Sequence, residues 1–233
     1  SYKEGFSTAS WTIKGTDQTN RIRGDCCVPG MREWQNSYRG ELAGLAGSIY
    51  HIWSVAKWHG ITSGKARVGC DGESPLNQIR DFKVAVSPFQ KHYDFLSAIR
   101  RMLRECPIEI ELFHVAGHQD DDPHAKLSRE ALMNIEMDVA AKAHWIRHHD
   151  DDSFDPHEKI PYEGWSVWMG FTKLTGNMRR VVQEDIHGRQ LERHWITKRK
   201  RFKHESIKYI DWTATENAMA NSTIRRRHWI TKH

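Results

Sequence analysis

Three acidic residues, far apart in the sequence, stand where carboxylates could act together on a phosphate ester. Glu41 lies near the start of a helical apolar pattern, Asp71 ends a short strand pattern, and Asp138 lies midway along another helical pattern. Carboxylate oxygens suit Mg²⁺, which binds few carboxylates together with substrate phosphate oxygens. Two such ions, ~3.5–4 Å apart, stabilise the attacking and leaving oxygens of a phosphodiester. Each acid alone is typical of a solvated surface charge, so the prediction depends on their joint placement.

The segments that would position these acids alternate between strand and helix patterns. Strand patterns cover 6–14, 21–28, 66–71 and 108–116, and helix patterns cover 37–58, 88–105 and 128–147. A further strand around 26–34 stays open. Because hairpin strands come first and crossover helices follow, we expect an α/β fold in which helices cover a mixed sheet. Asp71 would then lie at a strand end, where the ligand sites of such sheets open.

The helix patterns also predict which faces pack inward. The 37–58 helix carries apolar residues at three- and four-residue steps, beside a stripe of three glycines: Gly40, Gly44 and Gly47. Each glycine costs about 1 kcal/mol against alanine, so the stripe predicts close packing of the helix. For the 128–147 helix the expected inward residues are Leu132, Ile135, Val139, Ala143 and Ile146. On that helix, Asp138 lies four residues after Asn134 and therefore on the same face. An aspartate in the middle of a helix is unfavourable by helix propensity, and a bound cation would explain why one is present there.

Four stretches of the chain match one known family in order and spacing. They are Ser37-Tyr-Arg-Gly-Glu41-Leu-Ala, Cys70-Asp71, Val115-Ala-Gly-His118-Gln-Asp120 and Asn134-Ile-Glu-Met-Asp138-Val-Ala. Across about residues 1–147 they resemble the ribonuclease H domain, most closely its retroelement-encoded versions. The resemblance implies a five-stranded mixed sheet with flanking helices. It also implies metal-dependent cleavage of the RNA strand of an RNA/DNA hybrid.

The same resemblance implies which acids hold the metal. The family uses four acids and two Mg²⁺ ions, with Mn²⁺ as an alternative, and Glu41, Asp71 and Asp138 match the second, third and fourth acids. The first acid belongs to the family's first strand as Asp-Gly-Ser, and this sequence starts at the matching Ser1. We therefore expect the first acid two residues before Ser1, and a large loss of activity without it. Asp17 and Asp25 follow the first apolar run and are poor substitutes.

Other residues in these stretches are candidates for contact with nucleic acid: Ser1, Ser37, Tyr38 and Asn134. An A-form minor groove displays 2′-hydroxyl groups, which polar side chains can sense. His118 resembles the Gly-His of the family's final loop, where imidazole could move a proton near the leaving group. The favoured alternative is that His118 has a structural role and forms a hydrogen bond with the loop backbone. His124 is the rival candidate for the proton transfer.

Charge is distributed unevenly along the chain. Residues 1–150 carry 19 basic and 19 acidic side chains, whereas residues 151–233 carry 16 and 11. Near tryptophans in the second part lie two basic clusters: Lys198, Arg199, Lys200 and Arg201, then Arg225, Arg226 and Arg227. Basic residues interleaved with aromatic rings suit phosphate contact and base stacking. A nuclear-import signal or a solvated face is the alternative.

The predicted organisation is an RNase H-like domain over 1–150, a linker over 151–161, and a small, basic, Trp-rich, mostly helical region over 162–233. With 38% hydrophobic and 28% charged residues a core is expected, and no apolar run approaches the ~18 residues of a membrane span. The four cysteines form no C-x-x-C pair, so they predict reduced thiols in an intracellular protein, cytoplasmic or nuclear. The expected partners are an RNA/DNA hybrid and a covalently linked reverse transcriptase or other polyprotein domain.

Three functions stay open at this stage. The first is an endonuclease that works within a retroelement polyprotein. The second is a catalytically decayed RNase H-like module that binds nucleic acid or acts as a spacer. The third and weakest is an integrase or exonuclease on the same fold, since a fold does not fix a function.

Overall fold

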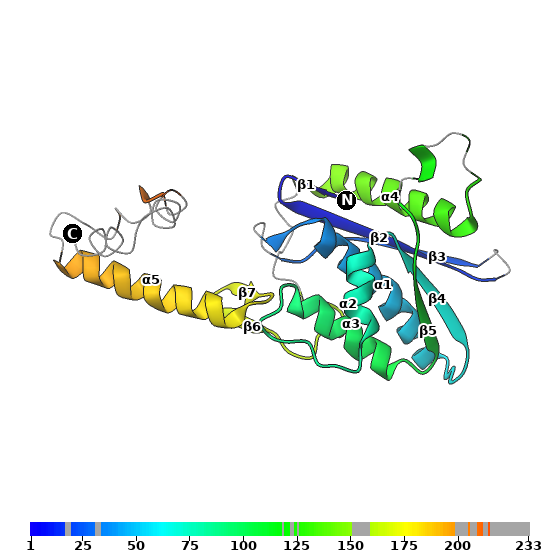
Figure 1. The fold of residues 1–233 in the computed structure, drawn as a ribbon, viewed down its shortest axis with the longest axis horizontal. Helices are drawn as coiled ribbons and strands as arrows, with labels where there is room; N and C mark the ends of the chain where they lie inside the picture. Colours follow the sequence, from blue (N-terminus) through cyan, green and yellow to red (C-terminus); the bar gives the residue numbers. More distant parts are fainter. Residues whose placement is uncertain are drawn as a thin grey trace. The chain divides into compact units, whose positions relative to one another are not determined.

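The structure is a computed structural model that describes residues 1–16, 20–30, 34–117, 119–121, 124, 126–150, 159–198, 205, 209–211 and 214. The chain divides into two compact units, Ser1–Arg179 and Arg180–His233. The first unit is α/β and holds all the described strands (Figure 1). The second holds most of helix α5 (Met178–Lys198), the last long element of the described chain.

The first strands form an antiparallel sheet. Strand β1 (Tyr2–Lys3) pairs with β2 (Phe6–Lys14), and β2 pairs with β3 (Arg21–Cys27) from Thr8 through Lys14. Backbone bonds between Ser1 and Thr8 in both directions extend the β1 pairing by one residue. The predicted strands over 6–14 and 21–28 are thus confirmed, whereas no strand follows Cys27 in the described part of 26–34.

Helix α1 (Ser37–Trp58) covers one face of this sheet and begins and ends where the sequence predicts. Asn36 caps its first turn by accepting a hydrogen bond from the Arg39 backbone. The glycine stripe faces β2: a Cβ at Gly44 would lie 3.5 Å from the Ser10 carbonyl oxygen, and one at Gly47 would overlap the Trp11 ring at 2.7 Å. The close packing predicted from these glycines is confirmed.

A second, parallel pair of strands carries the chain to Asp71. Strand β4 (Lys65–Cys70) pairs with β5 (Glu109–His114). Between them lie α2 (Glu73–Arg80) and α3 (Tyr93–Glu105), and a buried apolar core joins α1, α2, α3 and β4. The described strands therefore form one sheet of three strands and two of two strands, not the single five-stranded sheet that the resemblance implies. The α/β class and the mixture of parallel and antiparallel strands agree with the prediction.

Helix α4 (Arg129–His148) lies across the other face of β2 and β3 (Figure 1). The Thr8 hydroxyl donates to the Ala141 carbonyl oxygen at 2.7 Å, and Trp145 Nε1 donates to the Phe6 carbonyl oxygen. The inward face predicted for this helix is wrong, because Leu132, Val139 and Ile146 are more than half exposed. The buried positions belong instead to small residues and a histidine: Ala131, Ala140, Ala141 and His144.

Residues 159–176 belong to the first unit and pack on its core. Ile160 is buried in its core, and the Tyr162 ring lies 4.4 Å from that of Trp53. The short hairpin of β6 (Val167–Met169) and β7 (Thr172–Leu174) follows, and Lys173 forms a buried ion pair with Glu163 at 2.7 Å. The larger part of the predicted linker, 151–158, lies outside the described residues.

Candidate functional site

Glu41 and Asp71 lie side by side although they come from different elements. Glu41 projects from the second turn of α1, and Asp71 directly follows β4. A Cβ at Gly72 would come within 2.1 Å of Glu41 Oε2, so the glycine leaves the room that this carboxylate occupies. Burial, and then the nearby negative charge of Asp71, raise the pKa of Glu41. Two carboxylates that repel each other in this way favour a cation between them.

Asp138, the third candidate acid, lies on α4. Its carboxylate is half exposed and pairs with Lys142, one turn later, at 2.6 Å. The 3₁₀ turn η2 (Gln119–Asp121) packs near this pair, since Asp138 and then Asp120 and Asp121 raise the pKa of Lys142. Asp138 therefore already has a cation beside it, supplied by the chain itself.

The α-amino group of Ser1 lies within reach of the charges of all three acids. Burial is the main cause that lowers its pKa, and the charges of Asp138, Asp71 and Glu41 oppose that shift. The amine donates to the Thr8 carbonyl oxygen at 2.8 Å and is thereby fixed at the β1 end of the antiparallel sheet. Carboxylates from α1, from the end of β4 and from α4 thus all act on one position.

The donor set at this point fits Mg²⁺ in its chemistry. All three side chains offer carboxylate oxygens, the ligand type of a hard divalent cation, and the Gly72 cradle holds one of them next to another. Within the described ranges, no three His, Cys, Asp or Glu side chains are close enough together to form a ready-made metal site. Glu41 and Asp71 are neighbours, whereas Asp138 is paired with Lys142.

Of the residues predicted to contact nucleic acid, Tyr38 differs most from a surface residue. Its ring packs against the core and lies 5.2 Å from the His92 ring. Burial, followed by the charge of Glu41, raises the pKa of Tyr38 to about 12, so the phenol stays protonated. Ser1 and Ser37 are exposed, and Asn134 is half-buried on α4.

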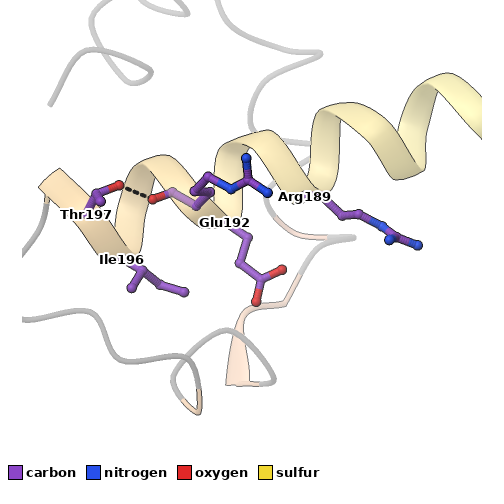
Figure 2. Close-up of a pocket in the computed structure, with 5 residues that line it drawn as sticks. Arg189, Glu192, Ile196 and Thr197 are labelled. Carbon is purple, nitrogen blue, oxygen red and sulfur yellow. Dashed lines mark hydrogen bonds between the residues drawn. The ribbon is translucent and has the colours of Figure 1, made fainter.

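Several predicted residues lie outside the described part of the chain: His118, Arg199, Lys200, Arg201, Arg225, Arg226 and Arg227. The rival His124 is described and exposed. Lys198 is the last residue of α5, next to a hollow lined by Arg189, Glu192, Arg193, Ile196 and Thr197, most of which Figure 2 labels. No residue of the three-acid cluster lines this hollow.

Sequence reasoning missed two residues at the site. His114 ends β5, and its Nε2 lies 3.0 Å from the Asp71 carbonyl oxygen, which ties the two strand ends together. Lys142 was missed because a lysine four residues after an aspartate is the usual pattern of a solvated helix pair. The parallel register that joins Cys70 to His114 is the signal that could have found His114.

Comparison with protein-family models, with curated proteins and with solved structures found no match to this chain. Among the described residues, no helix is long and apolar enough to cross a membrane.

Proposed function

We propose that this chain is a ribonuclease H-type endonuclease that uses divalent metal ions to cleave the RNA strand of RNA/DNA hybrids within a retroelement polyprotein. One observation carries the proposal: Glu41 on α1 and Asp71 at the end of β4 lie side by side, in the room that Gly72 leaves for the Glu41 carboxylate. Two carboxylates held side by side in a partly buried place are costly unless a cation compensates their charge.

The roles of the three acids follow from their surroundings. Glu41 and Asp71 would hold Mg²⁺ as a pair. Asp138 would join them as a ligand after its ion pair with Lys142 breaks. Bound Mg²⁺ supplies electrostatic stabilisation of the phosphate and its attacking and leaving oxygens. The chain's own contribution is to fix the acids on rigid elements, so that substrate binding needs little rearrangement of them.

The unpaired edge of β2 supports an RNase H-like sheet. On its β3 side β2 is paired from Thr8 through Lys14, but on the β1 side the described pairing stops at Thr8. A strand continuing upstream of Ser1 in the same register would place its second residue opposite Ser10. That strand would run along the free edge of β2 and could join the two sheets into one, with the family's first acid beside the other three.

Selectivity for a hybrid is proposed to arise at the exposed start of α1 and in the basic C-terminal region. Ser37 is exposed one turn before Glu41, where it could sense a 2′-hydroxyl group. Nucleic-acid contact in the second unit would come from phosphate attraction by its basic side chains, which makes binding weaken as salt rises.

Two chains test the proposal: the 233-residue chain and the same chain with Asp-Gly added before Ser1. Both are incubated with Mg²⁺ and a labelled RNA/DNA hybrid, and cleavage is followed on a denaturing gel. We expect the extended chain to cleave the RNA strand and the shorter chain to be far slower. Absence of cleavage by both chains, at protein concentrations where the hybrid is bound, would favour the decayed module.

The decisive variant is Asp71→Asn in the extended chain. Loss of one metal ligand should reduce the cleavage rate by about 100-fold or more, as removal of other electrostatic catalytic groups does. Hybrid binding, measured by fluorescence anisotropy, should remain. The control is Asp81→Asn, the same chemical change at an exposed acid that follows α2. Equal activity of the two variants would contradict the proposed site, and preference for duplex DNA would favour the integrase or exonuclease reading.

A further inference from the structure

A second group of chemically active side chains lies between β3 and α4, apart from the three acids. Cys27 Sγ lies 3.4 Å from Nε2 of His144. The other ring nitrogen, Nδ1, lies 3.0 Å from Oδ1 of Asp25. A thiol, an imidazole and a carboxylate therefore follow one another in contact, the order in which a nucleophile, its base and the group that orients the base are arranged.

The fold explains why these three side chains meet. Asp25 and Cys27 are two residues apart in β3, so both point to the same face of the sheet, the face that α4 covers. Cys26, between them, points to the opposite face and packs against the core. His144 lies on the inward face of α4 and is only 9% exposed. Because His144 is buried between α4 and β3, its imidazole is confined to a position beside the Cys27 thiol.

The surroundings of His144 set its protonation. Burial, as the largest cause, lowers the pKa of its imidazole, while the charge of Asp25 raises it. His148 and Arg147, on the same helix, act with burial, and the Arg147 guanidinium also lies 3.7 Å from Asp25. Nδ1 has no regular hydrogen bond within the described residues, so Asp25 acts on the ring chiefly through its charge. That charge favours the proton on Nδ1 and leaves Nε2 as the acceptor that faces the thiol.

We propose that Cys27, His144 and Asp25 form a thiol–imidazole–carboxylate site that makes Cys27 a reactive cysteine, open to oxidation by small hydroperoxides. His144 Nε2 takes the thiol proton as the sulfur attacks the distal oxygen of the peroxide. The S–O bond forms, the O–O bond breaks, and the imidazolium returns its proton to the departing oxygen. With hydrogen peroxide the products are a sulfenic acid and water, so the thiol loses the two electrons that the peroxide gains.

The structure provides internal controls for this site. Cys106, which follows α3, is half-buried like Cys27 but lies in a different part of the fold. Cys26 is the sequence neighbour of Cys27 and is also half-buried, on the other side of the sheet. In the described part of the chain, Cys106 has no hydrogen bond to a histidine ring, so it is not predicted to share the activation of Cys27.

The experiment uses the full 233-residue chain with hydrogen peroxide and a dimedone trap for sulfenic acid, and locates the product by peptide fragmentation. Cys27 should be oxidised about tenfold faster than Cys106, because only Cys27 has an imidazole beside it to take the thiol proton. His144→Gln should remove that advantage with the circular dichroism spectrum unchanged, whereas Cys26→Ser should leave it intact. Equal rates at Cys27 and Cys106 in the unmodified chain would overturn the proposal, as would an unchanged Cys27 rate in His144→Gln.

A second variant keeps the test decisive if His144→Gln does not fold. Asp25→Asn removes the charge that orients the imidazole while keeping the shape of the side chain. It should slow Cys27 several-fold and shift the pH profile of its alkylation by iodoacetamide between pH 6 and 9. A profile identical to that of the unmodified chain would contradict the role of Asp25 and, with it, the site. This inference does not depend on the proposed nuclease activity.

Discussion

Glu41 is held where its charge is unfavourable, and this has a consequence for stability. Because burial and Asp71 raise its pKa, the folded chain binds protons more tightly there than the unfolded chain does. The free energy of unfolding therefore falls as pH rises from the ordinary glutamate pKa through the raised one. Without metal, the candidate site is a local destabilising feature at neutral pH.

Glu41→Gln should therefore raise the midpoint of thermal unfolding at pH 7 in EDTA and should have no effect at pH 4 or below. Circular dichroism melts across this range measure the difference. Glu111→Gln is a control for which the change in stability should have the opposite sign, because a hydrogen bond from Lys65 lowers the pKa of Glu111. That variant should be slightly less stable at pH 7 and equal at low pH. A lower melting point for Glu41→Gln at pH 7 would contradict the repulsion argument.

Lys142 should compete with a metal ion for Asp138. The two groups are 2.6 Å apart, and a unit charge about 4 Å away contributes about 1 kcal/mol in water, so Lys142→Gln should tighten Mg²⁺ binding about fivefold. Titration calorimetry on the extended chain measures the affinity. Lys57→Gln, the same change in the last turn of α1, should leave it unchanged. Weaker Mg²⁺ binding in Lys142→Gln would mean that the lysine positions Asp138 rather than blocks it.

At the scale of single residues, the sequence proposed Glu41, Asp71 and Asp138 as candidates from their joint placement and from the motifs that resemble the family. It could not show that Asp138 would pair with Lys142, since both partners fit an ordinary exposed pair. The contact of Cys27 with His144 was equally hidden, because 117 residues separate them and only the packing of α4 on β3 brings them together.

Among the elements, α1 was predicted with correct bounds because its apolar spacing and its Asn36 cap agree. Helix α3 begins at Tyr93, later than the predicted 88, since His92 adopts a left-handed backbone conformation with φ 58° that breaks the pattern. Helix α2 was missed because eight residues carry too little periodicity. On α4 the pattern of large apolar residues was misleading: the helix approaches β2 and β3 so closely that alanines fit and larger side chains face outward.

This packing of α4 gives an element-scale prediction. Val139 is 61% exposed, so Val139→Lys should change the free energy of unfolding by no more than about 0.5 kcal/mol. Ala140, the next residue, is buried at 2% exposure, and Ala140→Leu should cost about 1–3 kcal/mol through overpacking. Urea unfolding curves of the two variants compare them directly. If Val139→Lys were the more damaging change, the orientation of α4 described above would be wrong.

For the whole molecule, the α/β class followed from the order of strand and helix patterns, but the pairing between strands did not. Strand partners depend on contacts between residues far apart in sequence. The local pattern of one strand does not determine its partner or the register of their pairing. The packing of residues 159–176 was also unforeseen, since Pro161 and the three glycines of this segment are typical of a loop. Burial of Ile160 and of the Glu163–Lys173 ion pair makes this segment part of the first unit.

The extent of the first unit can be tested by two truncations, one ending at Asp150 and one at Arg179. The longer fragment keeps Ile160, the Tyr162 ring beside Trp53, and the buried ion pair. Loss of Ile160 alone should cost about 1.5–3 kcal/mol, the usual contribution of a fully buried aliphatic side chain. The fragment ending at Asp150 should therefore unfold at clearly lower urea concentration, while the one ending at Arg179 should match the first transition of the full chain. Equal midpoints for the two fragments would mean that residues 159–176 add nothing to the core on which they pack.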